Sequence, residues 1–326
     1  MSLGINTKPS EEPVVPRRGG YQSSIEKPIF ITGLGRSGTT LIHTMLSTHP
    51  QVNWLSLLCG KFPKRPYLNR WLMSAIDVPI VNIYLRRRFV PLENYAFWDF
   101  YFPGFSMPNR DLVASDVSLR TKRALRTVAS ELLTAKRRRL LVKITGMPRM
   151  SFLRNVFPDA KFIHVIRDGR AVADSRMNTF WKGWQGLNIW PGKMPAEYQE
   201  EWERHHHSFV ALAGIEWKTH LDYVEVLKKD FPDISICQVR YEAFCADPIA
   251  ELRRIANHCE LSWPKDYDRA IRKQYVHSEN EKWKKDLTDA QRKILEDVLR
   301  PYLIKYGYEG RGQQAPTGSS RTPVRV

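Results

Sequence analysis

A glycine-rich segment near the start of the chain has the composition of an anion-binding loop. Residues 33–40 read GLGRSGTT, directly after an apolar run at 28–32 and before a helix-forming stretch at 40–47. Glycines allow a tight turn whose backbone N–H groups face inward, and the helix N-terminus adds partial positive charge. The residues expected to contact the anion are Gly35, Arg36, Ser37, Gly38, Thr39 and Thr40.

The loop nearly matches the ATP-type phosphate loop Gly-x4-Gly-Lys-Ser/Thr, but Thr39 stands where the lysine belongs. The fixed cation that reaches the β- and γ-phosphates is therefore missing at that position. A cation occurs instead at Arg36, two residues before Gly38. This difference favours an anion bound in another geometry, with no need for Mg²⁺.

A second candidate anion site follows a predicted strand at 161–166. Residues 167–175 read RDGRAVADS, so Arg167 lies at the carboxyl end of that strand, where open α/β sheets bind ligands. Ser175 comes eight residues later, about two helical turns along, and can approach the same anion as Arg167. An arginine fork plus a hydroxyl suits a single phosphate. The alternative is that Arg167 pairs with Asp168 or Asp174.

The elements that must position these residues alternate between strand and helix. Short apolar runs at 28–32, 140–144, 161–166 and 234–239 predict buried parallel strands, and the periodicity of 120–136, 196–229 and 288–304 predicts helices. We therefore expect an α/β fold, a P-loop-like central parallel sheet flanked by helices.

The domain organisation follows from the less regular segments. Residues 54–118 are aromatic and punctuated by prolines, which predicts an inserted, mostly helical substrate cap within a single domain at 27–308. Residues 1–26 and 309–326 are rich in Pro, Gly, Ser and Arg and are expected to be disordered tails.

Composition limits the classes of function. In 326 residues the 51 Lys+Arg exceed the 34 Asp+Glu by 17, and this excess attracts anions such as nucleic acid, an acidic membrane or a phosphorylated small molecule. Four cysteines form no disulfide framework, and no apolar run approaches the about 18 residues of a membrane span. The N-terminal segment has no apolar core of a signal peptide, so we expect a cytoplasmic protein.

These motifs together resemble those of the PAPS-dependent sulfotransferases, especially the bacterial and tyrosylprotein-type branch with an Arg-Ser-Gly-Thr-Thr loop. Tyr241-Glu242, followed by Ala246-Asp247-Pro248, resembles the family's Tyr-Glu…Asp-Pro segment, and 282–287 (KWKKDL) resembles its late basic-Trp segment. The resemblance implies that the loop holds the 5′-phosphosulfate of 3′-phosphoadenosine 5′-phosphosulfate (PAPS). It also implies that Arg167 and Ser175 hold the 3′-phosphate, that Tyr241 lies near the adenine, and that Lys282 and Trp283 close over the 3′-phosphate.

The implied reaction is in-line transfer of a sulfuryl group to a hydroxyl, leaving adenosine 3′,5′-bisphosphate (PAP) and using no metal. Arg36 would stabilise charge on the departing phosphate, and Lys143 is a candidate second cation unless it is a solvated strand-end lysine. Histidine, the usual base of the small-molecule branch, is missing from 143–148. Among the acidic candidates Asp77, Glu93 and Asp99, we favour Glu93, because aromatic neighbours would raise its basicity. Its alternative is an ion pair with the arginines at 86–88.

Other readings of the sequence remain open. A P-loop kinase is disfavoured by the missing lysine, and a non-catalytic nucleic-acid-binding protein by the scattered positive charge. The acceptor is expected to be a small-molecule or lipid-linked hydroxyl. The basic clusters at 86–88 and 136–139 are either solvated faces or surfaces that attract an acidic acceptor or a membrane. The aromatic residues Phe180, Trp181, Trp184 and Trp190 are candidates for the acceptor entrance, and the histidines at 205–207 are not expected to bind metal.

Overall fold

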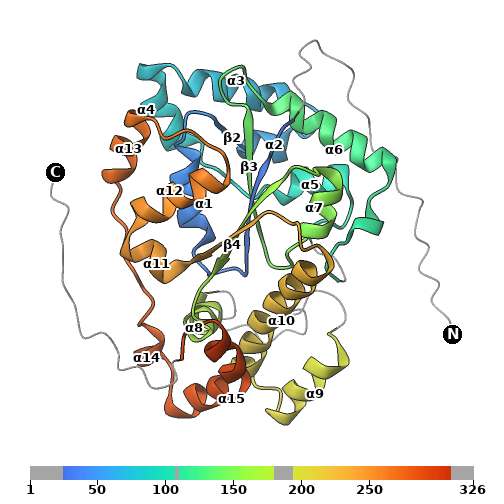
Figure 1. The fold of residues 1–326 in the computed structure, drawn as a ribbon, viewed down its shortest axis with the longest axis vertical. Coiled ribbons are helices and arrows are strands. Elements are labelled where there is room, and N and C mark those ends of the chain that lie inside the picture. The colour runs from blue at the N-terminus through green and yellow to red at the C-terminus, as the bar shows by residue number, and fades with distance from the viewer. Residues whose placement is uncertain (1–24, 107–109, 180–193, 310–326) are drawn as a thin grey trace.

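A five-stranded parallel sheet forms the centre of the computed structural model, which describes residues 25–106, 110–179 and 194–309. Its order is β2-β3-β1-β4-β5, with helices on both faces (Figure 1). The predicted α/β fold is thus confirmed. The strands are β1 (Ile29–Gly33), β2 (Val52–Trp54), β3 (Arg139–Thr145), β4 (Lys161–Ile166) and β5 (Ile236–Arg240).

The helices connect the strands and form the outer layers. They are α1 (Thr39–Ser47), α2 (Leu57–Lys61), α3 (Pro66–Ile76), α4 (Pro79–Arg88), α5 (Tyr95–Tyr101), α6 (Leu119–Leu132), α7 (Met150–Val156), α8 (Gly169–Thr179), α9 (Ala196–Arg204), α10 (Phe209–Asp230), α11 (Tyr241–Ala246), α12 (Pro248–His258), α13 (Lys265–Arg272), α14 (Trp283–Asp286) and α15 (Asp289–Lys305), with a 3₁₀ turn at Ala114–Asp116.

Alternation along β1 divides the core between the two faces of the sheet. Phe30 packs in a cluster with apolar residues of α5, α6 and α7. Ile29 and Ile31 point to the other face and pack with α1, α12 and α13. A strand that is buried on both faces must be apolar throughout, which is why 28–32 could be recognised as a central strand from its composition.

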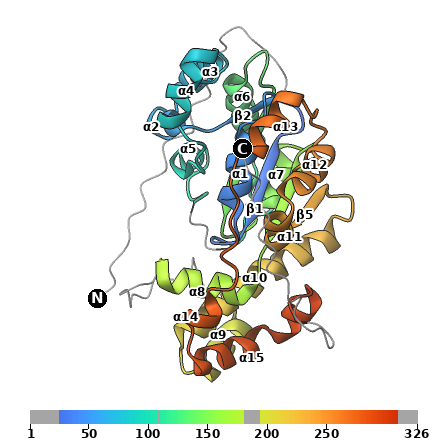
Figure 2. The same ribbon diagram turned by 90° about the vertical axis from the view of Figure 1, so that its left-hand side faces the viewer.

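A third cluster lies beyond the carboxyl ends of the strands. Apolar residues of α8, α10 and α15 pack there, away from α2–α4 at the other end of the molecule (Figure 2). Gly214 of α10 lets α15 approach, since an added Cβ would lie 3.1 Å from Val298 Cγ1. This cluster supports α8, the helix that carries Ser175.

The structure corrects two predicted elements. The single helix expected at 196–229 is two helices, α9 and α10, because His206 and His207 adopt positive φ angles of 52° and 54° and turn the chain. The strand β2 was not predicted. It has three residues, Val52–Trp54, and lies at the edge of the sheet beside β3, so it leaves little periodicity to detect.

Within the described residues, no helix is both long and apolar enough to cross a membrane. The four cysteines Cys59, Cys237, Cys245 and Cys259 are all free thiols. The segment after β2 is helical from α2 to α5 and returns to the sheet where the Leu92 backbone N–H donates to the Leu55 carbonyl over 2.9 Å. This return brings the residue after Leu92, Glu93, back to the carboxyl end of the sheet.

Candidate functional site

The glycine-rich loop runs from the end of β1 to the start of α1. Gly33 is required at the strand end, because an added Cβ would lie 2.7 Å from the Val165 carbonyl oxygen of β4. Positive φ angles at Arg36 (78°) and Gly38 (90°) then reverse the chain, and the Ser37 N–H donates to the Leu34 carbonyl over 3.1 Å. Gly38 has no side chain to cap α1, so the positive end of that helix faces the loop.

Arg36 joins the loop to the second candidate anion site. Its Nε donates to Ser175 Oγ over 2.9 Å, and Arg167 Nη1 donates to the Arg36 carbonyl over 3.0 Å. Arg36 and Ser175 are 139 residues apart in the chain, but β1 and β4 are neighbours in the sheet. The structure therefore places the two predicted anion-binding segments side by side.

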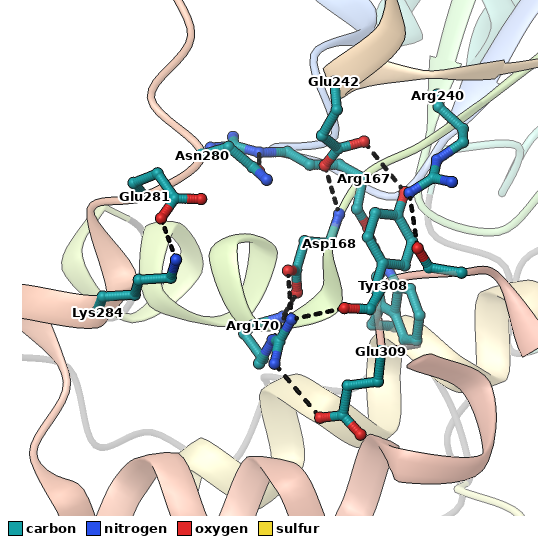
Figure 3. A network of polar contacts seen from close by, with 12 residues as sticks. Arg167, Asp168, Arg170, Arg240, Glu242, Asn280, Glu281, Lys284, Tyr308 and Glu309 are labelled. Atoms are coloured by element: carbon teal, nitrogen blue, oxygen red, sulfur yellow. Dashed lines mark hydrogen bonds and ion pairs between the residues drawn. The ribbon is translucent and has the colours of Figure 1, made fainter. Parts of the chain in front are cut away.

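Arg167 is held by groups that the sequence did not indicate. Its Nε donates to Asn280 Oδ1 over 3.0 Å and its Nη2 to the Glu279 carbonyl over 2.9 Å, so the chain just before α14 covers it (Figure 3). The residue is 8% exposed. A guanidinium fixed on three sides has a defined orientation, and an anion must share or replace these contacts to bind it.

The carboxylates next to Arg167 in the sequence have other partners. Asp168 pairs with Arg170 over 2.8 Å, and Asp174 accepts a hydrogen bond from Asn178 over 2.7 Å. Neither carboxylate forms an ion pair with Arg167, so the alternative pairing of Arg167 with Asp168 or Asp174 is wrong. Burial raises the pKa of Asp174.

Tyr241 packs between the two anion-binding segments. Its ring lies 4.5 Å from the Arg167 guanidinium, and an added Cβ on Gly38 would lie only 2.3 Å from its Cδ2. Burial raises the pKa of Tyr241 to about 12, which keeps the phenol neutral. The neighbouring Glu242 accepts a hydrogen bond from the Asp168 backbone N–H over 3.0 Å (Figure 3) and thereby ties α11 to the start of α8.

Lys143 and Glu93 form a second group of charges beside the loop. Lys143 Nζ donates to Thr40 Oγ1 over 2.8 Å and pairs with Glu93 Oε1 over 2.7 Å. Thr145 Oγ1 donates to the other carboxylate oxygen of Glu93 over 3.0 Å. The Lys143 side chain is 10% exposed, so the alternative of a solvated strand-end lysine is wrong. Glu93 pairs with Lys143 rather than with the arginines of α4.

An aromatic neighbour of Glu93 fixes the end of β3. The Tyr95 hydroxyl donates to the Thr145 carbonyl over 2.9 Å and accepts from the Thr145 N–H over 3.0 Å. Burial, with a further contribution from the Glu93 charge, raises the pKa of Tyr95 to about 12. Tyr95 thus stays protonated and holds Thr145, which in turn orients the Glu93 carboxylate.

Comparison with known proteins decides the family. A sequence model of the Sulfotransferase family matches residues 28–265, which include β1 to β5 and the loop. The chain belongs to the sulfotransferase family. It is 25% identical over 328 aligned positions, covering 91% of this chain and 79% of the relative, to the omega-hydroxy-beta-dihydromenaquinone-9 sulfotransferases of Mycobacterium bovis and Mycobacterium tuberculosis.

Solved sulfotransferase structures share the fold. Sulfotransferase STF9 from Mycobacterium avium matches with a TM-score of 0.57 and 18% identity, over 89% of this chain and 79% of that one. Sulfotransferase STF1 from Mycobacterium tuberculosis matches with a TM-score of 0.50 and 16% identity, over 84% of this chain and 77% of that one.

The other acidic candidates have structural partners. Asp77 pairs over 2.8 Å with Arg137, whose side chain is only 2% exposed, and Asp99 accepts the Ser106 N–H over 2.9 Å. The cluster at 136–139 is therefore not simply a solvated face. Of the three carboxylates considered, Glu93 is the one that contacts Lys143.

A buried histidine that the sequence did not indicate lies behind the site. His220 of α10 contacts the Gly146 carbonyl through Nδ1 over 2.7 Å and His164 through Nε2 over 3.2 Å. The carbonyl requires a proton on Nδ1, so Nε2 accepts from His164. Burial lowers the pKa of His220 to about 4. With both ring nitrogens engaged, His220 supports the end of β3 and has no nitrogen free to act as a base.

The remaining predicted residues lie at the margin of the site. Trp283 is buried against the Arg170 guanidinium, with 4.4 Å between that group and the ring, whereas Lys282 is exposed and pairs with Glu279 over 2.7 Å. The aromatic residues at 180–190 are outside the described residues. Within the described ranges, no group of three or more His, Cys, Asp or Glu is arranged to hold a metal ion.

Proposed function

We propose that this protein transfers a sulfuryl group from PAPS to a hydroxyl group of a small-molecule or lipid-linked acceptor. The observation that carries the proposal is the hydrogen bond of 2.9 Å from Arg36 to Ser175, because it joins the loop to the second anion site. A donor with phosphates at both its 5′ and 3′ positions requires two such neighbouring sites.

The chain offers groups for each part of the donor. The backbone N–H groups at the start of α1, with Arg36 and the exposed Thr40, suit the 5′-phosphosulfate. Ser37 and Thr39 are buried, so they would contribute backbone rather than hydroxyl contacts. Arg167 and Ser175 suit the 3′-phosphate, as the family resemblance implies, with Tyr241, Lys282 and Trp283 around the nucleoside.

The transfer step uses the charges on either side of the loop. The acceptor oxygen forms a bond to sulfur while the bond from sulfur to the 5′-phosphate oxygen breaks, and its electron pair stays on the phosphate. Arg36 stabilises that developing charge, and Lys143 stabilises the oxygens of the moving sulfuryl group. Glu93 accepts the proton that the acceptor hydroxyl releases.

The ion pair between Lys143 and Glu93 sets a condition on this scheme. A carboxylate engaged by an ammonium is not free to take a proton, so Lys143 must turn from Glu93 Oε1 toward the sulfuryl group when the donor is bound. Its contact with Thr40 of the loop already places Nζ beside the donor position. Donor binding would thereby release the base at the moment when the acceptor needs it.

The names of the relatives indicate the class of acceptor. By their names, the mycobacterial relatives described above act on omega-hydroxy-beta-dihydromenaquinone-9, a hydroxylated lipid. A small cavity beside the loop is lined by both apolar and polar residues, among them Leu34, Met147 and Thr219, so the lipid part of the proposed acceptor class comes from the relatives alone.

The proposal is tested by incubating the protein with PAPS labelled in the sulfuryl group and a panel of hydroxylated isoprenoids, sterols, phenols and sugars. Mass spectrometry should show one sulfuryl group on at least one acceptor, with PAP formed in equal amount. The Arg36→Ala variant is the control. The proposal is wrong if no acceptor in the panel causes PAP release. If the protein instead uses ATP in the presence of Mg²⁺ to form a phosphorylated product, it is a kinase.

A further inference from the structure

Helix α4 and the outer face of α3 expose an unusual set of large apolar side chains. Ile80 is 87% exposed, Ile83 64% and Tyr84 71%, and none of the residues of α4 is buried. On α3, Trp71 is 63% exposed and lies edge-on to Tyr67, with 5.2 Å between the ring centroids. Soluble proteins rarely leave such residues together in water unless the surface has a binding partner.

The spacing of these residues places them on one side of each helix. Positions 80, 83, 84 and 87 follow the three- and four-residue period of a helix, and so do Tyr67 and Trp71 on α3. The opposite sides pack inward, where Leu85 of α4 and Leu72 of α3 join a cluster around Trp54. The exposed sides are therefore a consequence of how the two helices pack on β2. We call the exposed residues Tyr67, Trp71, Ile80, Ile83, Tyr84 and Arg87 the α3–α4 face.

The segment that carries this face has almost only positive charges. Between Leu57 and Val90 the sequence has seven Lys or Arg residues and one carboxylate, Asp77. That carboxylate is already paired with Arg137 over 2.8 Å and with Lys136 over 3.6 Å. Arg87 and Arg88 are exposed at the end of α4, directly beside the apolar residues.

We infer that the α3–α4 face docks on an anionic lipid bilayer, with Ile80, Ile83 and Trp71 entering the interfacial region and Arg87 and Arg88 contacting the phosphates. Apolar side chains flanked by arginines are the composition of helices that lie in a membrane surface, and tryptophan and tyrosine prefer that depth.

Two other occupants fit the observations less well. A second copy of the chain, related by two-fold symmetry about this face, would bring the positive charges of both copies into one interface, with no free carboxylate between Leu57 and Val90 to offset them. A nucleic acid would satisfy the arginines but would leave the aliphatic Ile80 and Ile83 in water. A lipid bilayer provides both the anionic groups and the apolar layer.

The docking surface is connected to the reacting groups by a short piece of chain. Glu93 is five residues after Arg88, a distance of at most about 17 Å for a fully extended chain. If the proposed function holds, an acceptor anchored in the bilayer would therefore find the candidate base close to the membrane surface. The docking itself does not depend on the reaction and can be measured without it.

Vesicle co-sedimentation tests the inference with the full chain. We expect it to bind vesicles of phosphatidylcholine with phosphatidylglycerol, to bind pure phosphatidylcholine at least tenfold more weakly, and to be released by salt. The double variant Ile80→Glu/Ile83→Glu should bind vesicles at least tenfold more weakly. The control variant Val226→Glu, which changes a residue of α10 that is 57% exposed, should bind as the wild type does. The double variant Arg87→Glu/Arg88→Glu should weaken vesicle binding by a similar factor. The control variant Arg269→Glu, on α13, should leave vesicle binding unchanged.

A second readout locates the contact. Lipids carrying a quencher in the upper acyl chain should quench part of the tryptophan emission, and Trp71→Phe should remove that part. If the chain stays in the supernatant with anionic vesicles, or if the variant with both isoleucines replaced binds as the wild type does, the inference is wrong. The wild type could instead fail to bind vesicles and form dimers at high concentration. If the variant with both isoleucines replaced does not form these dimers, the face binds a second copy of the chain. None of these results bears on sulfuryl transfer, which the labelled-donor assay measures separately.

Discussion

Arg36 donates a hydrogen bond of 2.9 Å to Ser175, and this contact links the loop after β1 to the helix after β4. The same arginine accepts a hydrogen bond from Arg167 through its carbonyl. One residue of the loop therefore contacts the second candidate anion site twice, through its side chain to Ser175 and through its carbonyl to Arg167. This double connection is the basis for proposing a single nucleotide that occupies both.

Arg36→Ala should lower kcat by ~10²–10³-fold, because it removes a positive charge from the departing phosphate oxygen. Arg269→Ala, which changes an exposed arginine on α13, should leave kcat unchanged. Steady-state kinetics with PAPS, together with thermal unfolding to verify the fold, make the comparison. A variant at Arg36 with wild-type kcat would remove this residue from the mechanism.

Glu93→Gln should lower kcat by ~10²–10⁴-fold, because the amide cannot accept the acceptor proton. The loss should be much smaller with an acidic acceptor such as a nitrophenol, whose hydroxyl needs little help to ionise. Asp99→Asn is the matched control, since Asp99 accepts a backbone N–H from Ser106 and forms no hydrogen bond or ion pair with Lys143. Equal losses for weakly and strongly acidic acceptors would show that Glu93 has a structural role instead.

Gly38→Ala and Gly146→Ala separate two costs of adding a methyl group. Both glycines have positive φ angles, 90° and 84°, but an added Cβ meets Tyr241 at 2.3 Å only in the first and nothing within 4 Å in the second. We expect Gly146→Ala to lower the free energy of unfolding by about 1–2 kcal/mol. Gly38→Ala should cost about 1–3 kcal/mol more, from overpacking. Urea unfolding measures both, and equal losses would contradict the contact between the loop and Tyr241.

His220 should make the fold sensitive to acid. Burial lowers its pKa to about 4 in the folded state, whereas in the unfolded chain it titrates near 6.5. Below pH 6.5 the unfolded state binds the proton and the folded state does not, so this residue reduces stability by about 1.4 kcal/mol per pH unit down to about pH 4.

Urea unfolding at pH 7.5, 6 and 5 checks this sign. The stability of His220→Gln should fall less steeply toward acid than that of the wild type. His206→Gln, in the exposed turn between α9 and α10, should keep the wild-type slope. Parallel slopes for all three proteins would rule out His220 as a source of the acid sensitivity.

Local patterns were enough to predict the fold class and the loop. A run of buried residues followed at once by glycines and a helix is contiguous in the sequence, so β1, the loop and the start of α1 could be recognised together. Arg167 could be located because it follows a strand, and parallel strands end at the same edge of the sheet.

Long-range contacts could not be predicted in the same way. Asn280 and Glu279 contact Arg167 from more than 110 residues away, and only the family resemblance of the adjacent segment 282–287 pointed to this part of the chain. Glu93 was selected for its aromatic neighbours, yet the structure places its carboxylate between Lys143 and Thr145. The break between α9 and α10 depends on the φ angles of His206 and His207, which helical periodicity does not report.

The central claim is that both anion-binding segments hold one nucleotide, and isothermal titration calorimetry tests it most directly. PAP and adenosine 5′-monophosphate are titrated into the wild type, into Ser175→Ala, and into Ser130→Ala as the matched control on α6. We expect one PAP per chain, bound at least about tenfold more tightly than the monophosphate, with that preference reduced only in Ser175→Ala. Absence of heat from PAP, or equal affinities for the two nucleotides in the wild type, would contradict it.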